Sequence, residues 1–306
     1  MFLRRSCLKI CVFFAAAVIC APAVILPQDT VPPAARIVSL SPSTTEILYA
    51  LGAGDQVAGV TTYCVTPPEA RLKPKVGGFT NHNLEAIAAL KPDLVVLTPN
   101  GGSRLTYERL KSAGIPALSV SFYGLSDLEK SFELLGHASG HDEKAAALRT
   151  ELQTTLEAVK QAAPSGISLR AAYVTWRAPL ILAGAGTMEE EIMLFSGAKN
   201  SVKESSVRYP RWSEEAFLSS DPDVIFDASA YERDGDPEKE KKAAHDCWVR
   251  YKTLRAVRER HVYLIRREFL PVPGPRTVVQ IRVIAAVLKN PDDEGGKEAG
   301  YDRLSF

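Results

Sequence analysis

The feature that most constrains this chain's fold is an internal repeat between residues 83–96 and residues 213–226. The two stretches align without a gap, 130 residues apart. Each begins with Asn or Ser, has Glu-Ala at its third and fourth positions, and passes through Pro-Asp into an apolar run. Asn and Ser are preferred helix N-caps, and acidic residues favour the first turn, so each copy predicts a short helix joined by a turn to a buried strand. The repeat predicts one supersecondary unit used twice, once in each of two lobes.

Short apolar runs bounded by Gly or Pro alternate with helical patterns on both sides of the chain's middle. Strands are expected at 36–40, 56–60, 94–98, 116–120, 169–176, 179–182, 223–228 and 262–265. Helices are expected at 43–51, 83–90, 103–113, 188–196 and 275–288. This alternation predicts an α/β fold of two Rossmann-like lobes with mainly parallel sheets covered by helices.

The middle of the chain lacks strand signals and contains two helical patterns, near 126–138 and at 141–163. The second would span roughly 34 Å at the α-helical rise, which is long enough to cross a small domain. We therefore expect it to join the lobes as a backbone helix. The predicted organisation is a signal peptide at 1–23, an N-terminal lobe at 36–125, linking helices at 126–165, a C-terminal lobe at 166–290 and a tail at 291–306.

The N-terminus has the pattern of a secretory signal peptide. Arg4, Arg5 and Lys9 precede an apolar run at residues 10–19, which is shorter than the roughly 20 residues that a membrane-spanning helix needs. Ala21-Pro22-Ala23 supplies a small-x-small cleavage site ahead of Val24, which predicts export to the periplasm.

A lipoprotein is the alternative, with Cys20 as the acylated residue. Ile19 is bulky where such a processing site requires a small residue, so cleavage before Val24 is favoured.

The charge balance excludes some partners. The formal net charge is +1, and removal of a leader with three basic and no acidic residues would make it −2. Nucleic-acid binding is not expected, because clustered basic residues are missing and the charged run at 232–242 mixes both signs, as in a solvated loop. The mature chain, of about 280 residues, is long enough for two lobes and is expected to be a monomer.

Only Cys64 and Cys247 remain beyond the predicted leader. An export compartment would permit a disulfide between them. Because they lie in opposite halves and a bridge would restrict motion between lobes, two unpaired thiols are favoured.

The common catalytic motifs do not occur: the sequence has no G-x-S-x-G, H-E-x-x-H, C-x-x-C or P-loop pattern. Gly184-Ala185-Gly186 lacks the third glycine of a dinucleotide-binding loop and predicts a tight turn from strand to helix. No catalytic residue, metal site or cofactor is therefore expected. An exported α/β enzyme of unknown chemistry remains the alternative from a different functional class.

Aromatic residues and prolines gather in loops that follow predicted strands, two loops from each half. The loops contain Tyr63, Phe79, Tyr209 with Trp212, and Phe269. Some of these rings are expected to pack under their own loops, but together they would suit a largely apolar pocket for a large flat ligand. His82 lies in the Phe79 loop and remains a candidate, whereas the other histidines fit an ordinary surface role.

Glu85 and Glu215 occupy equivalent positions in the two repeats. Each would interact favourably with the positive end of a helix dipole, worth about 0.3–1 kcal/mol. Their matched placement also allows them to dock on basic pockets of a two-fold symmetric partner.

Several motifs together resemble a known family. They are Ser41-Pro42-Ser43-Thr44-Thr45-Glu46, Gly77-Gly78-Phe79, Asn83-Leu84-Glu85, Tyr209-Pro210, Ser213-Glu214-Glu215 and Pro275-Arg276. Over residues 36–288 the chain is similar to the periplasmic substrate-binding proteins with a rigid helical backbone (class III), and the order of its motifs is most similar to the cobalamin-binding members.

The resemblance implies a solute-binding component of an ABC importer that carries its ligand between two lobes to a permease dimer in the inner membrane. Tyr63, Phe79, Tyr209 and Glu268-Phe269-Leu270 match positions that contact the corrin ring. Glu85 and Glu215 match the glutamates that engage the permease. The transported ligand is expected to be cobalamin or a related corrinoid.

The sequence departs from the cobalamin binders at the ligand positions. Phe79 and Tyr209 stand where those proteins have Trp, and Glu268-Phe269-Leu270 replaces Asp-Trp-Phe. Haem and iron-siderophore complexes therefore remain alternatives. With haem, His82 or Tyr63 would be the candidate axial ligand.

Overall fold

The computed structural model describes residues 32–99, 103–163, 168–202, 207–229, 236–266, 272–296 and 300–306. Residues Pro33–Phe306 form one compact unit. The predicted leader and the Cys20 alternative lie outside the described residues. Within the part that is described, no helix combines the length and the apolar character needed to cross a membrane.

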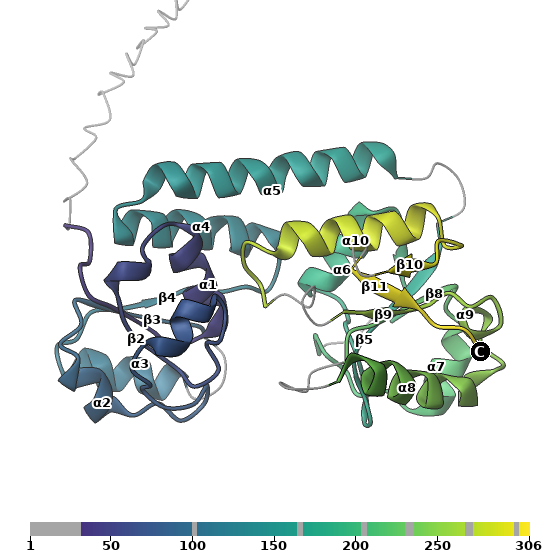
Figure 1. The fold of residues 1–306 in the computed structure, drawn as a ribbon, viewed down its shortest axis with the longest axis horizontal. Helices are drawn as coiled ribbons and strands as arrows, with labels where there is room; N and C mark the ends of the chain where they lie inside the picture. Colours follow the sequence, from purple (N-terminus) through teal and green to yellow (C-terminus); the bar gives the residue numbers. More distant parts are fainter. Residues whose placement is uncertain are drawn as a thin grey trace, which may run out of the picture. The chain divides into compact units, whose positions relative to one another are not determined.

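The first half contains a parallel sheet of four strands in the order β2-β1-β3-β4. Figure 1 labels β2, β3 and β4 of this sheet. Its strands are β1 (Ile37–Ser39), β2 (Val57–Val60), β3 (Leu94–Leu97) and β4 (Ala117–Ser119). Its helices are α1 (Pro42–Ala50), α2 (Leu84–Ala89) and α3 (Ser103–Ser112), with short 3-10 turns at Gly54–Gln56 and Pro68–Leu72. Helix α1 begins where Ser41 Oγ accepts the Thr44 N–H, and Pro42 fits the first turn because its missing N–H needs no partner there.

The second half contains a mixed sheet of seven strands in the order β10-β11-β9-β8-β5-β6, with β7 also paired to β5. The strands are β5 (Arg170–Arg177), β6 (Leu180–Leu182), β7 (Lys199–Asn200), β8 (Val224–Asp227), β9 (Val262–Ile265), β10 (Gly295–Gly296) and β11 (Tyr301–Arg303). Pairs among β5, β7, β8 and β9 are parallel, whereas β6, β10 and β11 pair antiparallel. The helices are α6 (Met188–Phe195), α7 (Glu214–Ser220), α8 (Pro237–Trp248), α9 (Arg255–Arg258) and α10 (Thr277–Lys289), with a 3-10 turn at Val249–Tyr251. The expected two-part α/β architecture is confirmed.

Two expectations for this half were wrong. The segment at 291–306 is not a simple tail, because β10 and β11 extend the sheet beyond β9. The charged run at 232–242 is not a loop throughout, because α8 begins at Pro237 after Asp236 caps it by accepting the Glu238 N–H. The helix is amphipathic: most of its charged residues are exposed, whereas Ala244 and Trp248, one turn apart, are buried.

Helices α4 (Leu125–Ser139) and α5 (Asp142–Ala162) follow the first sheet. Helix α5 packs against α4 near one end and α10 near the other (Figure 1). Arg282 Nη2 of α10 donates to Thr155 Oγ1 of α5 at 3.3 Å. The long helix expected over 141–163 is therefore present and contacts elements of both halves.

The two repeats have the same local geometry. Asn83 Oδ1 accepts the Ala86 N–H at 3.0 Å, and Ser213 Oγ accepts the Ala216 N–H at 3.1 Å. After each helix one residue takes a left-handed backbone: Lys91 with φ 47° and Asp221 with φ 38°. The helix starts and the turns thus coincide at the 130-residue spacing.

The repeat also includes a matched Arg–Asp arrangement that the aligned stretches alone did not reveal. Arg36, at the start of β1, donates its guanidinium to the Leu90 carbonyl, and its backbone N–H bonds to Asp93 Oδ2. Arg170, at the start of β5, donates to the carbonyl of Ser220 and to Asp223 in the same way. In both halves an arginine at the start of a central strand holds the end of the repeated helix.

One cluster of buried side chains extends through both halves. It includes Ile47 of α1, Leu152 of α5, Ile284 of α10 and Tyr263 of β9. Because these elements share a core, the two halves are joined by apolar packing as well as by the chain.

Candidate ligand-binding cleft

A cavity of about 1070 Å³ is lined by residues from both halves of the chain. Its volume is at the upper end of the range for small-molecule sites, so it can hold a ligand larger than a typical drug. The lining residues that are described are Ser41, Pro42, Ser43, Tyr63, Phe79, Thr80, Asn81, Thr98, Phe122, Tyr123, Ala185, Gly186, Val207, Arg208, Tyr209, Val272 and Pro273.

Aromatic rings dominate the large side chains of this cleft. Tyr63, Phe79, Phe122 and Tyr123 come from the first half, and Tyr209 comes from the second. Tyr63 is 50% exposed and Tyr209 is 45% exposed, so neither ring is packed under its own loop. Exposed rings on opposite halves suit a flat, largely apolar ligand.

The Phe79 loop is a tight turn that requires glycine. Gly77 has φ +110°, and a Cβ there would lie 2.5 Å from the Asn81 carbonyl oxygen. The Gly78 N–H donates to the same carbonyl at 3.2 Å. This turn presents Phe79 and Thr80 to the cleft.

Tyr209 is positioned by a hydrogen bond to helix α6. Its hydroxyl donates to Glu189 Oε2 at 3.0 Å. Burial raises the pKa of the Glu189 carboxyl, and burial followed by the nearby Glu189 charge raises the pKa of the Tyr209 phenol. The phenol therefore stays protonated at neutral pH and donates its proton to Glu189 Oε2.

Gly184-Ala185-Gly186 forms the tight turn from β6 to α6 that the sequence predicts. Gly186 has φ +73°, and the Gly184 N–H donates to the Arg208 carbonyl at 2.7 Å. Thr187 then caps α6 by accepting the Glu190 N–H. The turn places Ala185 and Gly186 on the cleft wall.

Two polar contacts join the halves. The Arg276 guanidinium binds the Glu46 carboxylate through two hydrogen bonds, of 2.9 and 2.8 Å. Glu191 Oε2, from α6, accepts the Leu125 N–H at the start of α4 at 2.7 Å. Both acceptors carry a negative charge, which strengthens the bonds.

His82 is not among the residues that line the cleft. Its Nδ1 lies 2.9 Å from Thr106 Oγ1 of α3. Burial lowers the pKa of His82, although backbone contacts with Leu40 and Phe79 oppose this shift, so the ring is neutral at pH 7. The structure thus directs this side chain to α3 while its neighbour Phe79 lines the cleft.

The predicted ligand residues Glu268, Phe269 and Leu270 lie outside the described residues. Val272 and Pro273, just after them, line the cleft. Phe122, Tyr123 and Arg208 line it too, although no sequence motif indicated them. Phe122 and Tyr123 follow β4, and loops after the carboxyl ends of parallel strands are the usual place for ligand contacts.

Glu85 and Glu215 are exposed in the first turns of α2 and α7. Neither lines the cleft. Cys64 is buried and Cys247 is partly buried, and both are free thiols, as expected from their positions in opposite halves of the sequence.

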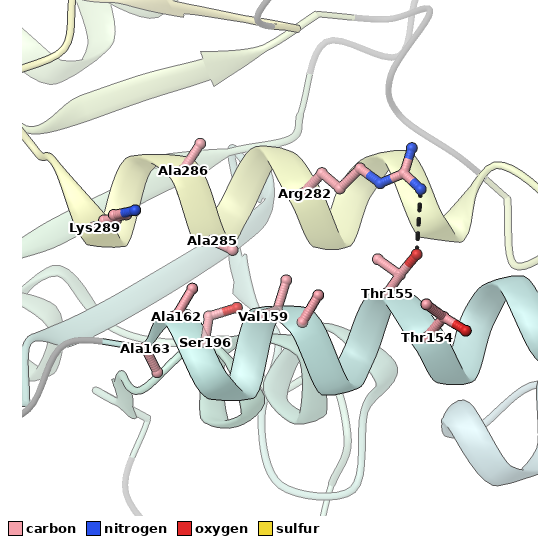
Figure 2. Close-up of a pocket in the computed structure, with 11 residues that line it drawn as sticks. Thr154, Thr155, Val159, Ala162, Ala163, Ser196, Arg282, Ala285, Ala286 and Lys289 are labelled. Atoms are coloured by element: carbon pink, nitrogen blue, oxygen red, sulfur yellow. Dashed lines mark hydrogen bonds between the residues drawn. The ribbon is translucent and has the colours of Figure 1, made fainter.

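A smaller hollow of about 360 Å³ lies between α5 and α10 and shares no lining residue with the cleft (Figure 2). Alanines, Thr154, Thr155 and Val159 form much of its wall, with Arg282 and Lys289 along α10. None of the described residues that line it is aromatic. The cleft is therefore the better candidate for a large flat ligand.

The chain is similar in sequence to substrate-binding proteins over most of its length. The chain is 29% identical to the vitamin B12-binding protein of Vibrio parahaemolyticus, over 80% of this chain and 86% of that protein. It is 32% identical to an uncharacterized ABC transporter substrate-binding lipoprotein of Bacillus subtilis, over 82% of this chain and 78% of that protein.

Solved structures show the same fold. The periplasmic vitamin B12-binding protein of Vibrio cholerae is 28% identical, with a TM-score of 0.73 over 84% of this chain and 97% of that one. A periplasmic heme-binding protein of Pseudomonas aeruginosa is 23% identical, with a TM-score of 0.73 over 89% of this chain and 99% of that one, a likeness of fold alone. The model of the family described as periplasmic binding protein matches residues 37–268. The chain therefore belongs to the periplasmic binding protein family.

Proposed function

We propose that this protein binds cobalamin or a related corrinoid in the cleft and delivers it to an ABC importer. The observation that carries the proposal is the set of aromatic rings that line the cleft from both halves, Tyr63 and Phe79 on one side and Tyr209 on the other. A corrin is a large flat ring with apolar faces, which such side chains can contact on both sides. The similarity to vitamin B12-binding proteins supports the same ligand class.

The contacts between the halves support a largely preformed site. Helix α5 packs on elements of both halves, and Glu46–Arg276 and Leu125–Glu191 join them directly. Binding to such a site needs little rearrangement of the backbone.

Haem is the second candidate, and Tyr63 is the observation that favours it. A tyrosine phenolate is a known axial ligand of haem iron, and Tyr63 is half exposed in the cleft. His82 is a weaker candidate ligand, because its Nδ1 contacts Thr106 and the residue does not line the cleft.

The test is a calorimetric titration of the mature chain with cyanocobalamin and, separately, with haemin, together with the visible spectrum of each ligand. We expect saturable one-to-one binding of cyanocobalamin. Binding of haemin alone, with a Soret band that Tyr63→Phe changes, would overturn the corrinoid assignment in favour of haem. The titration does not rely on tryptophan fluorescence, because Trp176, Trp212 and Trp248 do not line the cleft.

Two substitutions test the aromatic contacts. Phe79→Ala and Tyr209→Ala should each weaken cyanocobalamin binding roughly ten-fold, equivalent to about 1.4 kcal/mol. Phe195→Ala is the matched control, because Phe195 is 38% exposed and lies outside the cleft. Equal affinity of all three variants would contradict a site built on these rings.

We propose export to the periplasm with cleavage before Val24. Mass spectrometry of the protein purified from the envelope fraction should give a chain that begins at Val24. A lipid-modified N-terminus at Cys20 would instead identify a lipoprotein, as in the Bacillus subtilis relative.

Glu85 and Glu215 are proposed to contact the permease, one for each half of a two-fold symmetric partner. Both are exposed at the same place in the repeat. Reversal of both charges to Arg should abolish stimulation of ATP hydrolysis by a reconstituted vitamin B12 importer and leave cyanocobalamin affinity unchanged. Glu143→Arg is the control, since Glu143 is also exposed and lies in the first turn of a helix, α5. Stimulation that survives the double reversal would refute this docking mode.

A further inference from the structure

Arg208 is the one charged side chain among the described residues that line the cleft. The rest of that lining is aromatic, aliphatic or neutral and polar. A lone cation in such a wall is informative about the ligand, because its charge favours a negative group at one place only.

Two contacts hold the guanidinium in place. The guanidinium carbon, Cζ, lies 4.0 Å from the centroid of the Tyr123 ring, and Nε of Arg208 donates to the Gly186 carbonyl at 3.1 Å. Tyr123 precedes α4 in the first half, whereas Arg208 and Gly186 belong to the second, so the stack connects the two halves at the cleft. The ring face and the carbonyl together fix the orientation of the guanidinium plane.

The two Nη groups of Arg208 are the unused part of this side chain. Within the described ranges they have no hydrogen-bond acceptor, and no carboxylate forms an ion pair with Arg208. The residue is exposed, so these donors remain accessible to a ligand. Parallel N–H donors match the two oxygens of a phosphate or carboxylate.

We propose that Arg208 selects ligands that carry an acidic group at their edge, and that Tyr123 holds its guanidinium ready for that group. The inference deepens the proposed function: in a corrinoid the partner is the phosphodiester that joins the ring side chain to the lower base. The aromatic residues bind the ring, and Arg208 distinguishes complete cobalamin from ring precursors without the phosphodiester. A merely structural arginine, packed on Tyr123 to support the loop, would not make this distinction.

The test is a cycle of two ligands and two proteins. Affinities for cyanocobalamin and for dicyanocobinamide, which lacks the phosphodiester and the lower base, are measured for the parent chain and for Arg208→Gln. We expect Arg208→Gln to weaken cyanocobalamin binding at least ten-fold and to change dicyanocobinamide binding less than two-fold. The parent chain's affinity for cyanocobalamin should fall with added salt, and that of Arg208→Gln should fall much less.

Two further variants separate the mechanism from a folding defect. Arg211→Gln is the matched control, because Arg211 is exposed nearby in sequence and does not line the cleft; it should leave both affinities unchanged. Tyr123→Leu should weaken cyanocobalamin binding more than dicyanocobinamide binding. Thermal unfolding of each variant establishes that it folds.

Each outcome decides the inference. Equal losses for both ligands in Arg208→Gln would overturn it, since the residue would then support the site without reading the phosphodiester. An unchanged cyanocobalamin affinity would overturn it as well. If the parent chain binds neither corrinoid, the proposed function fails first. The cycle is then repeated with haemin, which carries two carboxylates, and with haemin dimethyl ester, in which both are esterified. If Arg208→Gln does not weaken haemin binding more than binding of the ester, the inference is overturned as well.

Discussion

Arg276 and Glu46 are 230 residues apart in the sequence and form a two-point ion pair that joins the halves. Glu46 lies on α1 and is only 6% exposed, while Arg276 directly precedes α10. A buried carboxylate is costly without a partner, so this pair ties the position of α10 to that of α1.

Arg276→Met should destabilise the chain by about 2–3 kcal/mol. This is below the roughly 3–5 kcal/mol for breaking a fully buried pair, because the Arg276 side chain is 33% exposed. Glu46→Gln in the same background should recover part of the loss, since no buried charge then remains. Urea unfolding of both variants measures the effect. If Arg276→Met alone is as stable as the parent, the Glu46 carboxylate is adequately solvated without Arg276.

Gly124→Ala should act through Glu191. The Gly124 backbone is extended and suits any residue, but a Cβ there would lie 2.5 Å from Glu191 Oε1. The carboxylate would have to leave the Leu125 N–H, at a cost of about 1 kcal/mol, as for loss of a helix cap.

Glu191→Ala should cost a similar amount, and the double variant should be no less stable than either single one. Gly274→Ala is the control, because its Cβ would meet only ordinary contacts, the nearest at 3.6 Å. Strictly additive losses in the denaturant midpoints of the two variants would disprove the link between Gly124 and Glu191.

Lys91→Gly should stabilise the chain by about 0.5–1 kcal/mol, since glycine relieves the left-handed backbone at φ 47°. Asp221→Gly, at the equivalent position with φ 38°, should give no gain, because Asp221 Oδ1 accepts the Arg255 N–H at 2.7 Å. Thermal unfolding compares the two. Equal effects would mean that the hydrogen bond to Arg255 contributes nothing.

The repeat made part of this fold predictable from local signals. In each copy the N-cap (Asn83 or Ser213), the Pro-Asp turn and the apolar run all lie within a stretch of about 14 residues. The arginines at 36 and 170 belong to the same unit, yet they lie far from the repeated stretch, and only strand pairing brings them to it. Helix α8 was missed because its charges obscured the buried Ala244 and Trp248.

The cleft was predictable where its residues belong to recognisable motifs. Tyr63, Phe79 and Tyr209 were expected as ligand contacts, and all three line the cavity. Tyr123 and Arg208 were not expected, because the contact between them depends on how the two halves pack. His82 was a candidate because it shares a loop with Phe79, but its Nδ1 lies 2.9 Å from Thr106 Oγ1 and the residue does not line the cleft.

Asp223 should make stability depend on pH. Burial raises the pKa of its carboxyl. Hydrogen bonds from the backbone and guanidinium of Arg170, together with one from Arg255, lower this pKa by more than burial raises it, so the net shift is downward. A carboxyl whose pKa is lowered by folding adds stability above its unfolded pKa, near 3.8, and loses that contribution as pH falls through the folded value.

Asp223→Asn should therefore cost about 2 kcal/mol at pH 7, in the range for hydrogen bonds to a charged group. The cost should shrink steadily below about pH 4, where the parent carboxyl also becomes neutral. Urea midpoints at pH 7, 5, 4 and 3 measure this difference. Asp55→Asn is the control, because Asp55 is exposed and has no ion pair within the described ranges, so only a small effect on stability is expected. A cost of Asp223→Asn that stays constant from pH 7 to pH 3 would show that Arg170 and Arg255 bind the asparagine as well as the carboxylate.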